Sequence, residues 1–390
     1  MIRSRNFIFI TLADFIVRTA YQIGKTPLLP IFALSLGATD AYLGLIVSVS
    51  TFTGMLLKPF VGIFSDRWGR RSWLFLGTSF FSFIPFVYPF IHTPKQLFVV
   101  RIIHGLATAI YGPVTLAFVA EQSQKHLAER FGWFSMARSA SYVIGPTVAG
   151  WLLLILSPAS VFTVIGILSS VAFLPVFLLS ESKAFLNECH TSLTKQIVQA
   201  LKTSSCKPSV WFTGVVDTTM YIALYAVKAF LPIYALSIGT STALIGGFFA
   251  VQEAVHMLFK PMGGRLGDRL GYLLTISLGM AVLGTALLLF NYSHSHFVLL
   301  VSFVLMGVTQ ALISPSTVAL VTKKVDKDNL GSSLGLIGQF ANAGKVAGPV
   351  IAGTMINWLD FTTTFFSIGG ALIFVSVVLF LGSWGGDDSD

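Results

Sequence analysis

The chain has 390 residues, of which 54% are hydrophobic and only 11% are charged, and its mean hydropathy is +0.80. A soluble domain carries about a quarter charged residues, so this composition excludes a soluble enzyme or binding module and predicts a membrane protein. The net charge of +9 does not indicate nucleic-acid binding, because the basic residues gather in short loops on one side of the apolar runs, as the positive-inside rule describes.

The apolar runs are predicted to be membrane-spanning helices. Lipid offers no partner to backbone N–H and C=O groups, and runs of about 20 residues fit helices rather than barrel strands. The first run lacks a small-residue cleavage site, so we expect it to remain as a span. The twelve predicted spans are 7–35, 41–64, 73–91, 96–120, 132–156, 160–180, 210–237, 243–266, 273–291, 296–322, 332–356 and 361–383.

One long polar stretch, 181–209, separates six spans from six. We therefore predict an N-terminal half, 1–180, a cytoplasmic linker and a C-terminal half, 210–390. Within the linker, apolar residues recur every four positions, which fits either a short amphipathic helix at the membrane surface or an irregular tether. The basic loops and the even number of spans place both termini in the cytoplasm of a plasma-membrane protein.

The two halves are copies of one another. Leu28–Gly69 aligns without a gap with Phe230–Gly271, 202 residues later. Each copy holds six spans, so both have the same orientation in the membrane, and a site at their interface can open to either side as they rock. The sequence thus predicts an all-α membrane protein with twelve transmembrane helices in two six-helix repeats around a central cavity.

Three short motifs accompany the repeat. The loop after the second span has the pattern G-x-x-x-D-R-x-G-R-R, formed by Gly62, Asp66, Arg67, Gly69, Arg70 and Arg71, and its second copy holds Gly264, Asp268 and Arg269. The fourth span contains R-x-x-x-G as Arg101 and Gly105. The fifth span contains Gly145-Pro146-Thr147-Val148-Ala149-Gly150, and the eleventh has a similar segment beginning at Gly348-Pro349.

With these motifs the chain resembles the major facilitator superfamily over essentially its whole length. The resemblance implies a transporter that works by alternating access, with helices one, four, seven and ten around the cavity. The fifth-helix motif is that of proton-coupled exporters such as multidrug antiporters, although Ala149 stands where a glycine is usual. The resemblance also implies that a monomer suffices.

The motif loop is predicted to form a gate on the cytoplasmic side. Arg70 can pair with Glu121 at the end of the fourth span, and the resemblance implies that such contacts hold the halves together in one state. The alternative is that the loop only anchors the topology through its positive charge. Tyr272 replaces the arginine in the second copy and Lys323 replaces the glutamate, so that copy cannot make the same ion pair.

The Gly-Pro pairs of the fifth and eleventh spans remove a backbone donor and bend their helices. Their small neighbours allow close helix contact. A role in antiport is implied by the resemblance alone.

Charged residues inside the spans are the strongest indication of mechanism, because each costs about 2.5–3.5 kcal/mol on insertion scales and so is expected to face a cavity or a partner. Asp14, Arg18, Gln22 and Lys25 share one face of the first span because they stand three or four residues apart. The other polar faces consist of Asp217, Tyr221, Tyr225 and Lys228 on the seventh span, Arg101, His104 and Tyr111 on the fourth, Glu253 and His256 on the eighth, and Gln339, Asn342 and Lys345 on the eleventh.

Asp14 and Glu253 are the first candidates for proton coupling, because an apolar cavity favours the protonated form of a carboxyl group near neutral pH. His104, His256 and Asp217 follow. Each has a structural alternative: a static Asp14–Arg18 pair, a helix-dipole partner for Asp217, or simple packing for the others.

The charges counted deep in the spans are five positive and three negative, which favours an anionic or zwitterionic substrate over a cation. They are Arg18, Lys25, Arg101, Lys228 and Lys345 against Asp14, Asp217 and Glu253.

These features predict a secondary active transporter of a small organic solute, coupled to protons and working as an exporter. The alternative within transport is an importer or facilitator of an anionic metabolite. An enzyme is not expected, since H-E-x-x-H, Walker, G-x-S-x-G and Cys/His-cluster patterns are missing, and neither a cofactor nor a metal is expected. A channel is disfavoured because no filter-like repeated loop is present. The expected partners are the substrate, protons and the lipid bilayer, with no nucleic acid.

Overall fold

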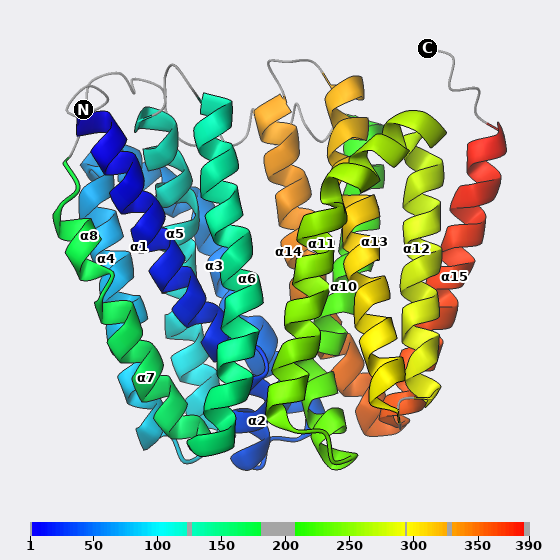
Figure 1. The fold of residues 1–390 in the computed structure, drawn as a ribbon, viewed down its shortest axis with the longest axis horizontal. Helices are drawn as coiled ribbons and strands as arrows, with labels where there is room; N and C mark the ends of the chain where they lie inside the picture. Colours follow the sequence, from blue (N-terminus) through cyan, green and yellow to red (C-terminus); the bar gives the residue numbers. More distant parts are fainter. Residues whose placement is uncertain (1, 123–126, 181–206, 293–294, 326–329, 386–390) are drawn as a thin grey trace. The chain divides into compact units, whose positions relative to one another are not determined.

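The structure, a computed structural model of the chain, describes residues 2–122, 127–180, 207–292, 295–325 and 330–385, and its regular elements in those ranges are all helices. The chain forms two compact units, shown in Figure 1 from blue to green and from green to red. Most of the predicted linker, including its apolar repeat, lies outside the described residues.

The first unit holds the helices of the N-terminal half and the start of α11, Ser241–Gly246. Its elements are α1 (Ile2–Lys25), α2 (Leu28–Ser35), α3 (Asp40–Trp68), α4 (Arg70–Phe83), the 3-10 helix η1 (Ile84–Phe90), α5 (Pro94–Gln122), α6 (Leu127–Ile155), α7 (Pro158–Ser170) and α8 (Phe173–Phe177). Helix α5 packs against α1, α3 and α4, and α1 packs against α6 and α7.

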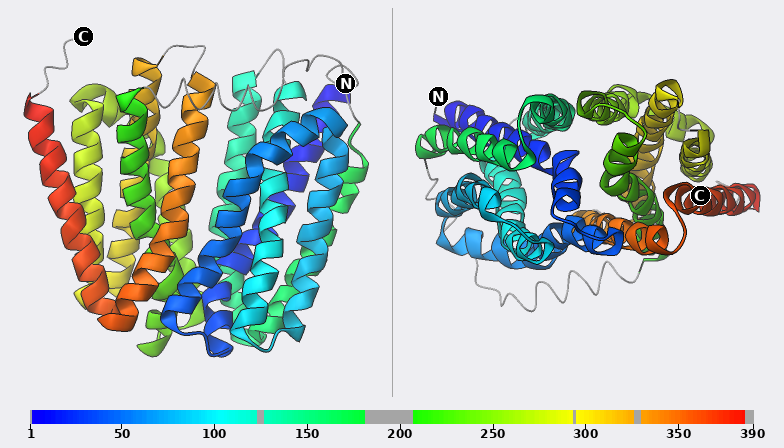
Figure 2. Two further views of the ribbon diagram at one scale, coloured as in Figure 1. Left: turned by 180° about the vertical axis from the view of Figure 1, so that it is seen from behind. Right: turned by 90° about the horizontal axis from the view of Figure 1, so that it is seen from below.

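The second unit holds the rest of α11 and the helices of the C-terminal half. Its elements are α10 (Pro208–Ser237), α11 (Thr242–Leu270), α12 (Tyr272–Leu288), the 3-10 helix η3 (Leu289–Tyr292), α13 (His296–Lys324), α14 (Leu330–Trp358) and α15 (Phe361–Gly385). Helix α14 packs along α10, and α12 packs against α13 and α15. Figure 2 shows the long helices of each unit from behind and nearly end-on.

Within the described ranges, nine helices are long and apolar enough to cross a membrane. The three remaining predicted spans correspond to α6, α12 and α14. Helix α12 is apolar but shorter, and α6 and α14 carry polar residues such as Arg138, Asn342 and Lys345.

The first predicted span, 7–35, is divided into two helices. Helix α1 ends at Lys25 and α2 begins at Leu28. Pro27 lies between them; it lacks a backbone N–H and disfavours helical geometry at the residue before it. Its counterpart in the second unit is Ala229, and α10 continues without a break to Ser237.

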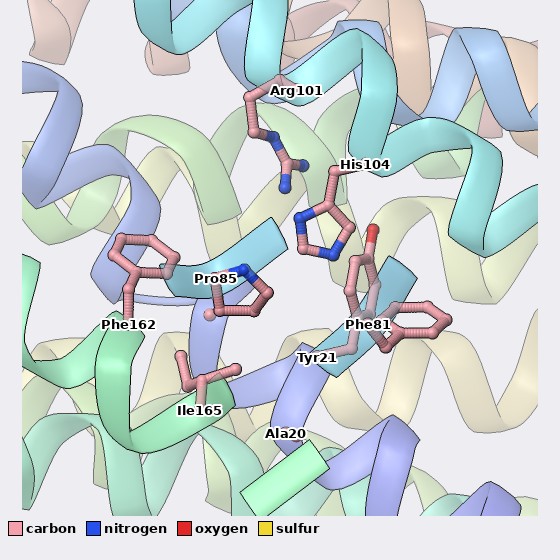
Figure 3. Close-up of a pocket in the computed structure, with 9 residues that line it drawn as sticks. Ala20, Tyr21, Phe81, Pro85, Arg101, His104, Phe162 and Ile165 are labelled. Carbon is pink, nitrogen blue, oxygen red and sulfur yellow. The ribbon is translucent and has the colours of Figure 1, made fainter. Parts of the chain in front are cut away.

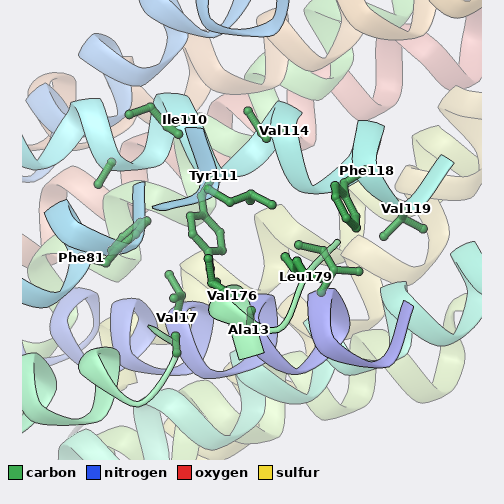
Figure 4. Close-up of a cluster of buried hydrophobic side chains, with 14 of the residues drawn as sticks. Ala13, Val17, Phe81, Ile110, Tyr111, Val114, Phe118, Val119, Val176 and Leu179 are labelled. Carbon is green, nitrogen blue, oxygen red and sulfur yellow. The ribbon is translucent and has the colours of Figure 1, made fainter. Parts of the chain in front are cut away.

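The core of the first unit is an apolar cluster between α1, α4, α5 and α8, shown in Figure 4. Phe81, Tyr111 and Phe118 are almost fully buried in it, beside the small residue Ala13 of α1. This packing fixes the polar face of α1 against α5 and α6, and so fixes the position of the neighbouring Asp14.

Equivalent close helix contacts occur inside each of the two units. A Cβ atom added to Gly105 would lie 2.9 Å from the carbonyl oxygen of Ser50. A Cβ added to Gly307 would lie 2.5 Å from the carbonyl oxygen of Gln252. Both members of the second pair lie 202 residues after their counterparts, so the duplication read from the sequence is also a duplication of packing.

Candidate functional site

Asp14 on α1 is held by two arginines. Its side chain is 1% exposed, and Arg18, one helical turn later, places Nε 3.2 Å from Oδ2 and Nη2 3.3 Å from Oδ1. Arg138 on α6 makes the same fork, at 2.9 Å and 3.0 Å, and also donates from Nη2 to Thr115 Oγ1 of α5 at 2.8 Å. A proton on Asp14 would disrupt both forks, so this geometry favours the static-pair interpretation over a proton carrier.

Arg138 was not among the residues expected at the site, although it lies inside the predicted fifth span. Lys58 and Lys260 also lie inside predicted spans and belong with Arg138 in the count of charged residues within the spans. With these three added, the charges counted deep in the spans are eight positive against three negative. The signal was present in the sequence, and it strengthens the preference for an anionic group on the substrate.

Glu253 on α11 is also paired. Lys228 Nζ of α10 lies 2.8 Å from its Oε1, and His256 Nδ1 lies 3.7 Å from its Oε2. Lys228 Nζ lies 5.3 Å from the ring centre of Tyr225 as well. The structure thus brings together four of the residues expected at the site, but as an ion-paired group.

Asp217 on α10 differs from both of these acids. It is 7% exposed, and it forms no ion pair within the part of the chain that the structure describes. Thr317 of α13 hydrogen-bonds its carboxyl group, while its buried Oδ1 has no hydrogen-bond partner. Asp217 can therefore gain or lose a proton without breaking an ion pair.

Asp217 lines a cavity of about 1000 Å³ within the second unit, between α10, α11, α13 and α14. The cavity also exposes His256, Lys260, Asn342 and Lys345, together with Tyr221. Lys345 Nζ lies 4.4 Å from the ring centre of Tyr221. Basic groups beside aromatic rings and apolar walls suit an organic solute that carries an anionic group.

The other polar residues of the first unit lie elsewhere. Arg101 and His104 border a small buried pocket (Figure 3). Tyr111 lies in the apolar core, with its Oη 3.3 Å from Thr78 Oγ1. Gln22 is 7% exposed, and Lys25 Nζ lies 5.5 Å from the ring centre of Tyr21.

The remaining candidates of the eleventh span and the second motif copy differ in their exposure and contacts. Gln339 on α14 is half-buried, and Arg269 at the end of α11 is exposed. A Cβ added to Gly264 would only touch Pro315, at 3.7 Å.

The motif loop joins α3 to α4 at Gly69, where the backbone conformation favours glycine. Gly69 has φ 86° and its counterpart Gly271 has φ 90°, in the left-handed region. Arg70 Nε forms an ion pair with Glu121 Oε1 of α5, and Arg71 Nη2 donates to the Phe177 carbonyl at 2.8 Å.

Some side chains of the motif lie outside the described residues, and the second copy of the motif makes different contacts. The side chains of Asp66 and Arg67 lie outside the described residues, and a Cβ added to Gly62 would meet nothing within 4 Å. In the second copy Tyr272 Oη donates to Asp268 Oδ1 at 2.9 Å, and Lys323 Nζ lies 5.4 Å from the Tyr272 ring centre.

The Gly-Pro segments lie where helices nearly touch. A Cβ on Gly145 would lie 3.1 Å from the backbone nitrogen of Ile23 on α1, and one on Gly348 would lie 2.3 Å from the carbonyl oxygen of Ile222 on α10. Pro146 and Pro349 lie inside α6 and α14. These residues let α6 and α14 pack closely on the helices that carry Asp14 and Asp217.

The chain matches a family model over most of its length and is similar in sequence to known transporters. The Major Facilitator Superfamily model matches residues 10–255 and 215–385. An uncharacterized MFS-type transporter of Methanocaldococcus jannaschii is 24% identical over 335 residues, which is 85% of this chain and 86% of that protein. The quinolone resistance protein NorA of Staphylococcus aureus is 24% identical over 366 residues, 90% of each chain.

Solved structures share the fold at low sequence identity. The nucleoside transporter NupG superimposes with a TM-score of 0.80 at 15% identity, covering 96% of this chain and 99% of that one. A bacterial homologue of the human lysosomal transporter Spinster, inward-facing and unoccupied, gives a TM-score of 0.73 at 14% identity, covering 97% and 95%.

Proposed function

Because this chain belongs to the Major Facilitator Superfamily, we propose that it exports a small organic anion or zwitterion in exchange for protons, by alternating access. The chain is a multi-pass membrane transporter. The observation that carries the finer proposal is the cavity of the second unit, where one unpaired acid, Asp217, faces His256, Lys260 and Lys345.

The chemistry of that cavity supports the substrate class. An anionic group on the solute would attract the lysine and histidine side chains at the cavity wall, and such attraction is stronger in a low-dielectric region than in water. Tyr221 and the apolar wall offer contact to the rest of an organic molecule. A purely cationic solute would meet like charge there.

Asp217 is the proton carrier in this proposal, in place of Asp14 and Glu253. Both of those acids are engaged by cations, at 2.9 Å and 2.8 Å. Asp217 lies in the same cavity as the proposed solute, so binding of the solute and protonation of the acid can exclude one another. That competition is what an antiporter needs.

The direction of transport rests on two further points. The fifth-helix segment resembles that of exporters, and a relative at 24% identity is named for drug resistance, which export would confer. We also propose that both termini are cytoplasmic and that the protein works as a monomer without nucleic acid. The motif loop, with its Arg70–Glu121 pair inside the first unit, helps close the inner gate in this proposal.

The test uses inside-out vesicles with an acid lumen and a pH-sensitive dye. Anionic, zwitterionic and cationic amphipathic compounds are added in turn to vesicles with the wild type, Asp217→Asn or Asp360→Asn. The last removes an exposed acid of the same unit outside the cavity and is the matched control. We expect an anionic or zwitterionic compound to release protons from wild-type and control vesicles, and release with Asp217→Asn to fall to the level of protein-free vesicles.

Two results would contradict this proposal. Proton release that persists in Asp217→Asn would remove Asp217 as the carrier. Release driven by cationic compounds alone would overturn the substrate class.

A facilitator or importer of an anionic metabolite is the second candidate, favoured by the excess of basic groups in the spans. It predicts that a labelled anion equilibrates across the vesicle membrane without any movement of protons, or together with protons in the same direction. The same vesicles therefore separate the two functions.

A further inference from the structure

Arg101 is a buried cation without an acid. It is 1% exposed, and it forms no ion pair with any acid in the described ranges of the chain. Tyr21 and Tyr88 hydrogen-bond its guanidinium group, but its Nε and Nη2 atoms have no hydrogen-bond partner there. A guanidinium group in a low-dielectric interior is costly unless its charge and its donors are satisfied.

A second unsatisfied nitrogen lies beside it. His104, three residues later on α5, places Nδ1 3.2 Å from Tyr88 Oη, while its buried Nε2 has no partner. If Tyr88 donates to Nδ1, then Nε2 carries the imidazole proton and is a donor. In that tautomer, three nitrogen donors of two neighbouring side chains lack an acceptor.

These two side chains point into one small pocket (Figure 3). Its volume, measured as the space open to the centre of a water-sized sphere, is about 10 Å³, so it can hold one small ion or one water molecule. The other walls are aromatic and aliphatic, and include Tyr21, Phe81 and Phe162.

The second unit shows that the fold does not need this charge. The positions 202 residues after Arg101, His104 and Tyr88 hold Phe303, Met306 and Phe290. All three are fully buried. The same place in the repeat is thus filled by ordinary apolar packing, so holding α5 in position does not require a cationic pocket.

We propose that this pocket binds a small monovalent anion of the size of chloride. Arg101 supplies the charge, and its Nε and Nη2 together with His104 Nε2 donate to the ion. The site belongs wholly to the first unit and is separate from the large cavity of the second. The proposal goes beyond the proposed transport activity and does not depend on it.

The experiment measures halide binding to purified protein in detergent. Equilibrium dialysis with radioactive chloride is run on the wild type, Arg101→Gln and Lys95→Gln, with gluconate keeping the ionic strength constant. Lys95→Gln removes one positive charge from the exposed start of the same helix and is the matched control. We expect saturable binding close to one chloride per chain in the wild type and the control, with at least about a tenfold weaker Kd in Arg101→Gln, the factor that corresponds to ~1.4 kcal/mol.

Competition identifies the kind of anion. Bromide is expected to displace chloride, whereas gluconate is too large. Formate separates a halide site from one that also accepts the carboxylate group of an organic ion, since only the latter lets formate compete.

The wild-type measurement alone can overturn the proposal. Absence of saturable chloride binding would mean that the pocket holds water or remains empty. Equal chloride affinity in the wild type and Arg101→Gln would place the ion elsewhere. If Arg101→Gln does not fold, His104→Gln provides the second variant, and an unchanged chloride Kd in that variant would exclude His104 as a ligand.

Discussion

Asp14 and Asp217 occupy the same position in the two repeats, 203 residues apart, yet their surroundings differ. In the first unit, Arg18 and Arg138 each fork onto the carboxylate. At the corresponding positions the second unit has Tyr221 and Ala341. The threonine is present in both units, as Thr115 beside Arg138 and as Thr317 beside Asp217.

The two copies of the repeat thus use the same acidic position in different ways. One copy locks its acid between two helices, where it joins α1 to α6. The other copy keeps the acid and loses both arginines, which leaves the carboxyl group available to a proton in a cavity. The reverse holds at Arg101, where the first unit keeps a charge and the second has Phe303.

The largest effect on stability is expected from Asp14→Asn. Without the carboxylate, Arg18 and Arg138 face one another as unpaired cations, and breaking a buried pair in this way costs about 3–5 kcal/mol. The free energy of unfolding can be measured by denaturant titration in detergent. Asp217→Asn, in which no ion pair is lost, is the control and should change stability far less. Equal destabilisation by the two variants would remove the contrast between the units.

An arginine introduced into the second unit should form an ion pair with Asp217, as Arg138 does with Asp14 in the first unit. Ala341→Arg places a guanidinium where Arg138 lies in the first unit, within reach of Asp217. Hydrogen bonds to charged groups are worth about 1.5–3 kcal/mol, so solute-driven proton release should fall by at least about tenfold. The vesicle assay measures it, with Ala341→Gln as a control for bulk. A similar loss in Ala341→Gln would show that obstruction of the cavity, rather than pairing, is responsible.

The equivalent glycine contacts should respond alike in both units. Gly105→Ala and Gly307→Ala each force a methyl group against a carbonyl oxygen, at 2.9 Å and 2.5 Å. Overpacking of this kind costs about 1–3 kcal/mol. Gly247→Ala, where a Cβ would meet nothing within 4 Å, is the control and should be neutral or slightly stabilising, since alanine favours helix. Thermal unfolding in detergent ranks the three, and tolerance at one of the two contacts alone would argue against equivalent packing.

The helices and the duplication could be predicted from the sequence because both depend on local patterns. Apolar runs fix the spans, and the gapless match of Leu28–Gly69 with Phe230–Gly271 fixes the repeat. The break after α1 also left a trace. Asp14 matches Asp217 at an offset of 203, whereas Leu28 matches Phe230 at 202, so the first half has one extra residue close to Pro27.

The pairing inside the site could not be predicted in this way. Asp14 and Arg138 lie 124 residues apart, and only the packing of α6 on α1 brings them together. The i, i+4 spacing of Asp14 and Arg18 indicated one pair but not the second arginine. A polar face on a helix shows that charges need partners, and it does not show which helix provides them. For that reason Asp14 and Glu253 ranked above Asp217 on sequence alone.

The smallest expected effect concerns the caps of the last helix in each repeat, outside the membrane spans. Ser157 caps α7 by accepting from the Ser160 backbone nitrogen at 3.2 Å, and Asp360, 203 residues later, accepts from the Thr363 nitrogen at 2.8 Å and from its hydroxyl at 2.7 Å. The hydrogen bond from the Thr363 backbone, followed by that from its hydroxyl, lowers the pKa of Asp360.

A carboxyl group whose pKa is lowered by folding stabilises the folded state above its unfolded pKa, and this contribution is lost as the pH falls through the folded value. Asp360→Ser should therefore remove a small part of the stability at neutral pH, and the difference from the wild type should disappear as the pH falls below about 4, the ordinary range of an aspartate pKa. The loss at neutral pH should be small, because serine caps the equivalent helix of the first unit. Thermal unfolding of wild type and variant between neutral and acidic pH measures the difference. A difference between the two curves that is the same at all pH values would show that the charge of Asp360 contributes nothing to the cap.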